Sequence, residues 1–174
     1  PAPEIWFSLI NTDLELELVE EVGWPHMSLI YDIMTVFFKS KNFNMEYCTE
    51  EIISLSKGIV DIFHSPDIRE REKLMKLFHA FYKSCSKHRY LLRREIKTFM
   101  QVFMCKPYRF VGISEILSVI IPIISGCHVP LHREYIDLFN SAILPLHSSD
   151  MAQMFHCPLA TALTIFCNKE PTLI

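Results

Sequence analysis

The sequence holds very little glycine, 4 residues in 174, although half of it is hydrophobic. Glycine supplies the positive-φ positions of tight hairpins, so few β-hairpins can form. Long apolar segments without glycine favour helices instead. We therefore expect an all-α protein.

The signatures of catalysis and metal binding are also missing. The six cysteines form no C-x-x-C pair, and the chain has no H-E-x-x-H, no glycine-rich phosphate loop and no nucleophile elbow. His128 and His132 have the spacing of two ligands on one helix, but Pro130 lies between them. We expect free thiols in a reducing compartment, and no metal, cofactor or enzymatic activity.

Long hydrophobic runs are absent as well. The best candidate for a membrane span, residues 116–129, is interrupted by polar residues and Pro122 and is too short to cross a bilayer. The acidic start of the chain has no signal-peptide pattern. We expect a soluble cytoplasmic protein without membrane contacts, and leave a nuclear location open.

The formal net charge is -3, but charge is unevenly spread, and two stretches each carry side chains of only one sign. Residues 1–22 contain six acids and no base, whereas residues 73–94 contain seven lysines and arginines, two histidines and no carboxylate. A helical surface of one sign is a candidate site for an acidic partner. Nucleic acid is the rival, because Tyr82, His88 and Tyr90 interleave with the bases as stacking platforms would. It is disfavoured because Arg133 is the only base in residues 111–166.

Prolines and short polar breaks at regular intervals separate the apolar segments. They divide the chain into an acidic, irregular lead-in, residues 1–22, and a domain of helical repeats, residues 23–174. Ser65 has the position of a helix cap, with Pro66 in the first turn and Asp67 favourable to the helix dipole. The segment that begins near Gly112 is apolar nearly all round and should be central. Apolar spacing predicts seven helices, over about 24–39, around 52–63, about 66–86, 89–104, from 112 onward, 132–144 and 158–168.

Pairs of these helices recur at roughly 40 residues, which is typical of helical-hairpin repeats. Such an array buries its core only between neighbouring repeats, so a terminal repeat needs a cap. The apolar end, Pro171 to Ile174, has none. We interpret the chain as a fragment of a longer solenoid, with a compact helical bundle as the alternative.

Several motifs follow one another over about residues 24–174: Trp24-Pro25-His26, Ser65-x-Asp67-x-Arg69-Glu70-Arg71, His79-x-x-Tyr82 with Arg89 and Arg93, Gly112-Ile113-x-Glu115-Ile116-Leu117, Pro130-Leu131 and Leu144-Pro145-Leu146-His147. In order and spacing they resemble the B-prime family of protein phosphatase 2A regulatory subunits. The resemblance implies a HEAT-like, non-catalytic solenoid that docks on the scaffold and catalytic subunits of the phosphatase. It implies substrate recruitment through a concave groove for short motifs of the form Leu-x-x-Ile-x-Glu. It also implies that the chain lacks the C-terminal repeats that contact the catalytic subunit.

A peptide of this form needs an apolar slot for its aliphatic side chains and cations for its acid. Helical spacing places His79, Tyr82 and Lys83 on one face, and pairs Arg89 with Arg93 and Val119 with Ile123. By resemblance, the groove positions are His79, Tyr82, Arg89, Arg93, Val119 and Ile123. His132 and Tyr135 occupy the places of a lysine and a histidine that hold the motif's glutamate.

The chain departs from the family at several of these places. His132 in place of lysine makes the glutamate pocket sensitive to pH, because imidazole is largely neutral at pH 7. Pro122 removes a backbone hydrogen bond to the carbonyl of Ser118 and should kink its helix. Other replacements are Ala80 for arginine, Lys76 for threonine, Ser118 for glutamate and Tyr135 for histidine.

Simpler interpretations of the same residues stay open. Val119 and Ile123 fit ordinary core positions, Tyr82 fits a core-edge aromatic, and His79 fits a structural histidine. Arg89, Arg93 and Arg94 fit a solvated face or a helix-end cluster. Two other functions also stay open: a repeat scaffold that has lost phosphatase binding, and an RNA-binding helical repeat.

Overall fold

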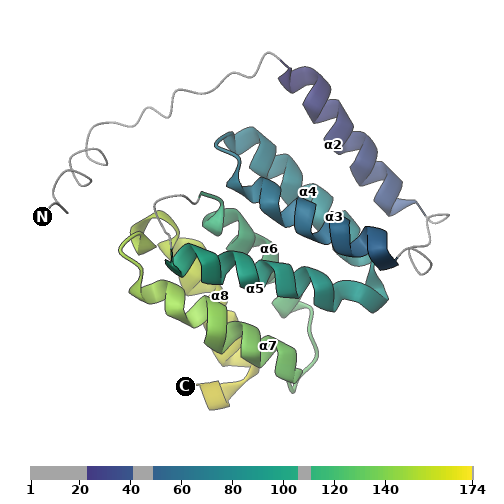
Figure 1. The fold of residues 1–174 in the computed structure, drawn as a ribbon. Coiled ribbons are helices and arrows are strands. Elements are labelled where there is room, and N and C mark those ends of the chain that lie inside the picture. Colours follow the sequence, from purple (N-terminus) through teal and green to yellow (C-terminus); the bar gives the residue numbers. More distant parts are fainter. Residues whose placement is uncertain (1–22, 41–48, 106–110, 174) are drawn as a thin grey trace, which may run out of the picture.

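A computed structural model describes residues 23–40, 49–105 and 111–173, and its elements there are all helical (Figure 1). The α-helices are α2 (Trp24–Lys39), α3 (Thr49–Asp61), α4 (Ile68–Ser84), α5 (Arg89–Cys105), α6 (Ile113–Ser125), α7 (Arg133–Leu138) and α8 (His156–Lys169). The all-α prediction and the seven predicted helices are confirmed. The predicted acidic lead-in, residues 1–22, lies outside the described residues.

The helices form two layers (Figure 1). In one layer α2 packs on α4, α4 on α6 and α6 on α8; in the other α3 packs on α5, and α5 on the helical turns that follow α7. Each helix therefore contacts its counterparts in the neighbouring pairs. This is the stacking of a HEAT-like helical repeat, in which the core lies between repeats.

Polar contacts between the repeats join residues about 40 positions apart. Lys73 donates to the carboxylate of Asp32 at 2.7 Å, across 41 positions. Lys97 donates to Asp137 at 2.6 Å, across 40 positions, and Arg93 donates to Glu134 across 41. The spacing expected from the helix pattern is thus the spacing at which side chains meet.

Helical spacing within residues 66–104 predicts ten buried side chains in α4, its C-cap and α5. All ten are buried: Leu74, Leu77, Phe78, Phe81, Cys85, Leu92, Ile96, Phe99, Met100 and Phe103. Helix α6 is central as expected, because it packs on α4 on one side and on α8 on the other. For α2 the apolar spacing predicts one face made of Met27, Ile30, Tyr31, Met34, Phe37 and Phe38, and this prediction was wrong in part. Tyr31 and Phe38 are buried, but Ile30 and Phe37 are about half exposed, because α2 packs mainly on α4.

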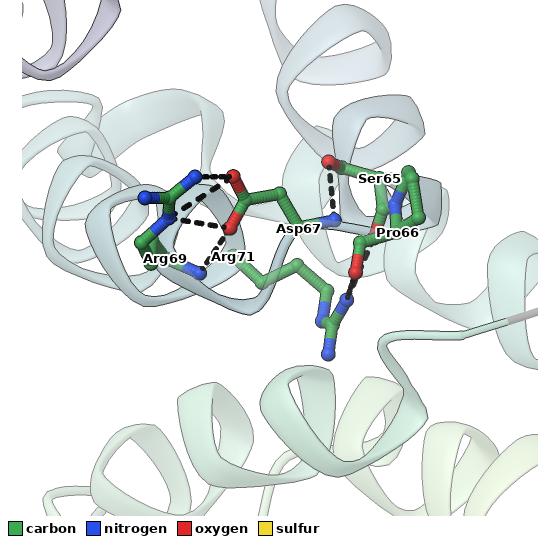
Figure 2. Close-up of polar contacts among 5 residues, drawn as sticks. All are labelled: Ser65, Pro66, Asp67, Arg69 and Arg71. Atoms are coloured by element: carbon green, nitrogen blue, oxygen red, sulfur yellow. Dashed lines mark hydrogen bonds and ion pairs between the residues drawn. The ribbon is translucent and has the colours of Figure 1, made fainter. Parts of the chain in front are cut away.

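The cap of α4 lies two residues later than predicted (Figure 2). Asp67, not Ser65, is the N-cap: its carboxylate accepts from the backbone N–H of Arg69 at 2.8 Å. The Arg69 guanidinium donates to the same carboxylate, and this lowers the pKa of Asp67. Ser65 instead accepts from the N–H of Asp67 at 3.2 Å, so it shapes the turn that leads into the cap.

A buried ion pair ties α4 to α6. Arg71 donates to the Glu115 carboxylate at 2.8 Å, and both side chains are mostly removed from solvent. The same guanidinium donates to the carbonyls of Ser65 and Pro66 at 2.7 and 3.0 Å. Figure 2 shows Arg71 beside these two residues of the turn. With these bonds satisfied, the buried charge is compensated.

Glycine is required at the start of α6. Gly112 has a φ of 90°, in the left-handed region, and a Cβ there would lie 2.1 Å from the carbonyl oxygen of Phe63. A larger residue would suffer both backbone strain and a clash. Further along, α6 continues past Pro122 to Ser125, so the proline does not end the helix. The kink stays a prediction.

The predicted helix over 132–144 is broken into three parts. The regular α7 ends at Leu138, and a π-helical turn (Phe139–Ile143) and a 3₁₀ turn (Leu144–Ser148) follow. Pro145 has no N–H for the carbonyl of Ser141 four residues earlier, and that carbonyl accepts from Gln101 at 3.3 Å. The proline therefore accounts for the change in helix type.

Among the described helices, none is both long and apolar enough to cross a bilayer. The five cysteines in the described part of the chain carry free thiols. Across residues 23–40, 49–105 and 111–173, no three metal-binding side chains gather at one place.

Candidate functional site

Four helices surround a hollow of about 380 Å³, which we call the central hollow. Its walls come from the end of α4, the first residue of α5, the end of α6 and the connection that follows it, and the first turn of α7. The lining residues are His79, Tyr82, Lys83, Arg89, Pro122, Ile123, Gly126, Cys127 and Tyr135. Six of the nine predicted site residues thus lie around one space.

Arg93 lies at the edge of the central hollow, joined to two of its lining tyrosines. Its Nη1 donates to the hydroxyl of Tyr82 at 2.9 Å, and its guanidinium lies over the Tyr135 ring, 4.8 Å from the centroid. Its Nη2 pairs with Glu134. Burial alone would lower the pKa of Arg93, but the bond to Glu134 and the two tyrosines raise it above its ordinary value. Arg93 is therefore a fixed, permanently charged group.

Arg89 closes the C-terminal end of α4. Its Nε donates to the carbonyl of Tyr82 at 2.9 Å, and its guanidinium lies 5.1 Å from the centroid of the Tyr82 ring. A cation at this end also interacts favourably with the helix dipole. Arg89 therefore stabilises a helix end and lines the central hollow at the same time.

The two tyrosines differ in burial. Tyr82 is buried, with 8% of its surface exposed, and Tyr135 is partly buried. Burial, together with hydrogen bonds to Cys127 and Tyr82, raises the pKa of Tyr135 well above its usual range. The Tyr135 hydroxyl therefore stays neutral at physiological pH. Lysine and arginine side chains supply the positive charge around the hollow.

His79 faces the hollow as a neutral group. Burial of its imidazole lowers its pKa below the ordinary value. The ring also lines a second hollow of about 700 Å³, bounded by Phe38, Lys39, Ser40, Lys76, Ala80, Lys83 and Ser84, which we call the lysine hollow. The two hollows share His79 and Lys83, and no described residue that lines either one is acidic.

Three predicted residues do not line the central hollow: Arg93, which contacts two of its lining tyrosines, and Val119 and His132, which lie apart from it. Val119 is fully buried in the core, one turn before Ile123 on α6, so only Ile123 reaches the lining. His132 is exposed and is the N-cap of α7, where its Nδ1 accepts from the N–H of Glu134 at 3.4 Å. The structure thus gives these two side chains packing and capping contacts.

The basic stretch is partly neutralised within the fold. Lys73 pairs with Asp32, Arg93 with Glu134 and Arg94 with Glu95. In the described part of the chain, Lys76 and Lys83 contact no carboxylate. Both lysines line the lysine hollow, and Lys83 lines the central hollow as well.

Pro122, Gly126, Cys127 and Glu134 belong to the site or its edge and were not predicted as site residues. Pro122 was noted only as a departure from the family pattern. Glu134 carries a usable signal, because it lies 41 residues after Arg93, one repeat away. For Gly126 and Cys127 the sequence offers no chemical signal, since the connection brings them to the hollow.

A comparison with protein families matches the whole chain, residues 1–174, to the model described as protein phosphatase 2A regulatory B subunit (B56 family). Curated relatives carry corresponding names. The chain is 30% identical over 163 residues to the serine/threonine-protein phosphatase 2A 56 kDa regulatory subunit delta isoform of Saccharomyces cerevisiae, covering 91% of the chain and 21% of the relative. It is 31% identical over 161 residues to the B' epsilon isoform of the 57 kDa regulatory subunit from Arabidopsis thaliana, covering 92% of the chain and 32% of that protein.

The human relative is slightly less similar. The 56 kDa regulatory subunit alpha isoform of Homo sapiens is 28% identical over 170 residues, with 94% of the chain and 34% of the human protein covered. The chain therefore spans about a fifth to a third of the length of these relatives.

Proposed function

The chain belongs to the B56 family of protein phosphatase 2A regulatory B subunits, and from this premise we propose that it recruits substrates by binding short peptides in the central hollow. The family consists of regulatory rather than catalytic subunits. The partners proposed for this chain are the scaffold and catalytic subunits of the phosphatase, and substrate proteins with motifs of the form Leu-x-x-Ile-x-Glu.

One observation carries the proposal: side chains from α4, α5, α6 and α7 gather around a single hollow that contains cations and an apolar wall. Lys83 and Arg89 supply positive charge, while Ile123 and Pro122 supply the wall. A peptide that alternates aliphatic and acidic side chains matches both features. A basic surface without an apolar wall would support only a general attraction to acids.

Arg93 is the residue best suited to the peptide's glutamate. It is held in place by Tyr82 and Tyr135, so little side-chain entropy would be lost on binding a carboxylate. Its present partner, Glu134, is about half exposed. In the proposed complex the peptide carboxylate shares or replaces that contact.

Substrate recruitment of this kind needs no chemistry from the chain itself. A bound motif tethers its protein near the catalytic subunit and raises the local substrate concentration. The effect on dephosphorylation would therefore appear as a lower substrate concentration for half-maximal rate, rather than as a faster chemical step.

Titration of a fluorescent Leu-x-x-Ile-x-Glu peptide into the purified chain tests the proposal. Fluorescence anisotropy should report binding in the micromolar range, about -8 kcal/mol, that is lost when the three motif positions are alanine. Equal anisotropy with both peptides, in a chain shown to be helical by circular dichroism, would overturn it. Pull-down of the scaffold and catalytic subunits then separates a working regulatory subunit from a repeat scaffold that has lost phosphatase binding.

RNA binding fits the structure less well. Tyr82 is buried and already in contact with the guanidinium of Arg89, so it presents no free face for a base. Helices α6, α7 and α8 carry no repeated row of lysines and arginines. A helical array that binds RNA needs such a row to contact the phosphates of the RNA backbone.

A further inference from the structure

The proposed function does not involve the acid-rich start of the chain, residues 1–22. Residues 14–21 read LELELVEE, an alternation of aliphatic and acidic side chains, and residues 1–22 contain no base. Within this run, Leu16, Val19 and Glu21 have the spacing of the motif Leu-x-x-Ile-x-Glu, with valine in place of isoleucine. The chain therefore carries a candidate ligand for its own candidate site.

The charges of the two regions are complementary. The central hollow and the lysine hollow meet at Lys83 and His79, and Lys39, Lys76 and Arg89 add further cations along the same surface. No described residue that lines either hollow is acidic. A segment with six acids and no base is attracted to such a surface, while its aliphatic side chains match the wall at Ile123.

The geometry argues against binding within one copy. Helices α2 and α4 run parallel, because Trp24 lies against Arg69, with its ring centroid 5.0 Å from the guanidinium, and Phe38 lies against Phe81, with ring centroids 4.9 Å apart. Tyr82 is thirteen residues beyond Arg69 on α4, about 20 Å along the helix. Glu21 is only three residues before Trp24, a tether of at most about 11 Å when fully extended.

We propose that Leu16 to Glu21 of one copy binds the central hollow of a second copy, so that the chain associates with itself and blocks its own peptide site. The inference rests on the proposed function of that hollow. Donor and acceptor surfaces differ, so the contact is heterologous and joins copies head to tail. Self-association then competes with substrate peptides, and it strengthens as the concentration of the chain rises.

A triple variant of the segment tests the proposal without touching the described helices. The motif variant is Leu16→Ala, Val19→Ala and Glu21→Gln. The matched control is Leu14→Ala, Leu18→Ala and Glu20→Gln, which removes two aliphatic side chains and one charge at positions that the motif does not specify. Sedimentation velocity from about 1 to about 100 µM should show larger species for the wild type and the control. The motif variant should stay monomeric over the same range.

Other sources of association give a different result. The outer face of α2 exposes Leu29, Ile33 and Val36, each by more than half. Association through that face would persist in the motif variant, and this outcome would overturn the proposal. A wild type that is monomeric at every concentration would overturn it as well.

Peptide titration separates this inference from the proposed function. A peptide of residues 12–23 and a generic Leu-x-x-Ile-x-Glu peptide are each titrated into the motif variant, and both should bind with comparable affinity. Binding of the generic peptide alone would overturn the self-association and leave the proposed function standing. Binding of neither peptide to a folded chain would overturn both. If the motif variant binds the generic peptide more tightly than the wild type at every chain concentration, the segment acts within one copy, and association between copies is overturned.

Discussion

At the scale of single residues, the structure separates two arginines that the sequence groups together. Arg93 is mostly buried and contacts Tyr82 and Tyr135, which line the central hollow, whereas Arg94 is exposed and pairs with its neighbour Glu95. The spacing of Arg89 and Arg93 predicted a shared face; Arg89 lines the hollow, and Arg93 contacts its lining through Tyr82 and Tyr135. The contact of Arg93 with Glu134 was not predicted, because i, i+4 spacing describes neighbours within one helix, whereas this contact lies at the repeat spacing of 41 residues.

This difference gives a matched pair of charge reversals. Arg93→Glu should weaken binding of the acidic motif peptide more than tenfold, about 1.4 kcal/mol, because it replaces a fixed cation with a repulsive charge. Arg94→Glu makes the same change in net charge one residue away and should alter the affinity less than threefold, about 0.6 kcal/mol. Fluorescence anisotropy gives both affinities, and thermal melting checks that each variant is folded. Equal losses in the two variants would mean that only overall charge matters.

At the scale of elements, the motifs that carry the family resemblance turn out to position helices. Asp67 caps α4, Arg71 and Glu115 join α4 to α6, and Gly112 admits the close approach of the Phe63 carbonyl. These residues set the relative placement of α4 and α6, and therefore the shape of the hollow between them. The sequence predicted the helix starts to within about three residues, because caps, prolines and glycines act locally. The broken helix after Leu138 was missed, since its cause lies in a proline seven residues further on.

Pro122 lies inside helix α6 and lines the central hollow, so its replacement tests its effect on both stability and peptide binding. Pro122→Ala restores an N–H for the carbonyl of Ser118, and should raise the free energy of unfolding by about 2 kcal/mol, the cost of an interior proline less its effect on the unfolded chain. The same change removes a ring from the lining of the central hollow. Urea unfolding gives the stability, and peptide titration the affinity. Pro25→Ala is the control, because Pro25 lies in the first turn of α2 and should give no such gain. An unchanged urea midpoint for Pro122→Ala would show that the fold already compensates for the missing bond.

At the scale of the whole molecule, the repeat length connects the sequence to the contacts. The pattern of helices predicted a period of roughly 40, and the ion pairs between repeats join residues 40 and 41 apart. The period indicates which helices are neighbours, in agreement with the contacts between successive repeats. It does not fix which side chains face a hollow: Val119 and Ile123 share a helical face, yet only Ile123 reaches the lining and Val119 is fully buried. That distinction depends on how far α4 and α6 diverge, which no local pattern encodes.

Two half-buried imidazoles link the stability of the whole chain to pH. Burial lowers the pKa of His79, and burial also lowers that of His64, against the opposing charge of Asp61. Above the ordinary imidazole pKa of 6.5, both residues are neutral in the folded and in the unfolded chain. Their protonation therefore does not reduce the free energy of unfolding in that pH range. As the pH falls below that value the unfolded chain binds protons that the folded chain resists, so stability is lost.

The pH profile of His79→Gln follows from this linkage. Between pH 7.5 and 5.5, about one unit either side of the ordinary imidazole pKa, the loss in urea midpoint should be smaller for His79→Gln than for the wild type. Lys76 and Lys83 line the same hollow as His79, and their positive charges disfavour protonation of its imidazole, as burial does. No described residue that lines the two hollows supplies a carboxylate to oppose them. His128→Gln, at an exposed histidine, should leave the loss unchanged. If His79→Gln loses as much stability as the wild type, the site is hydrated enough to accept the proton, and His79 becomes available as a cation for an acidic peptide.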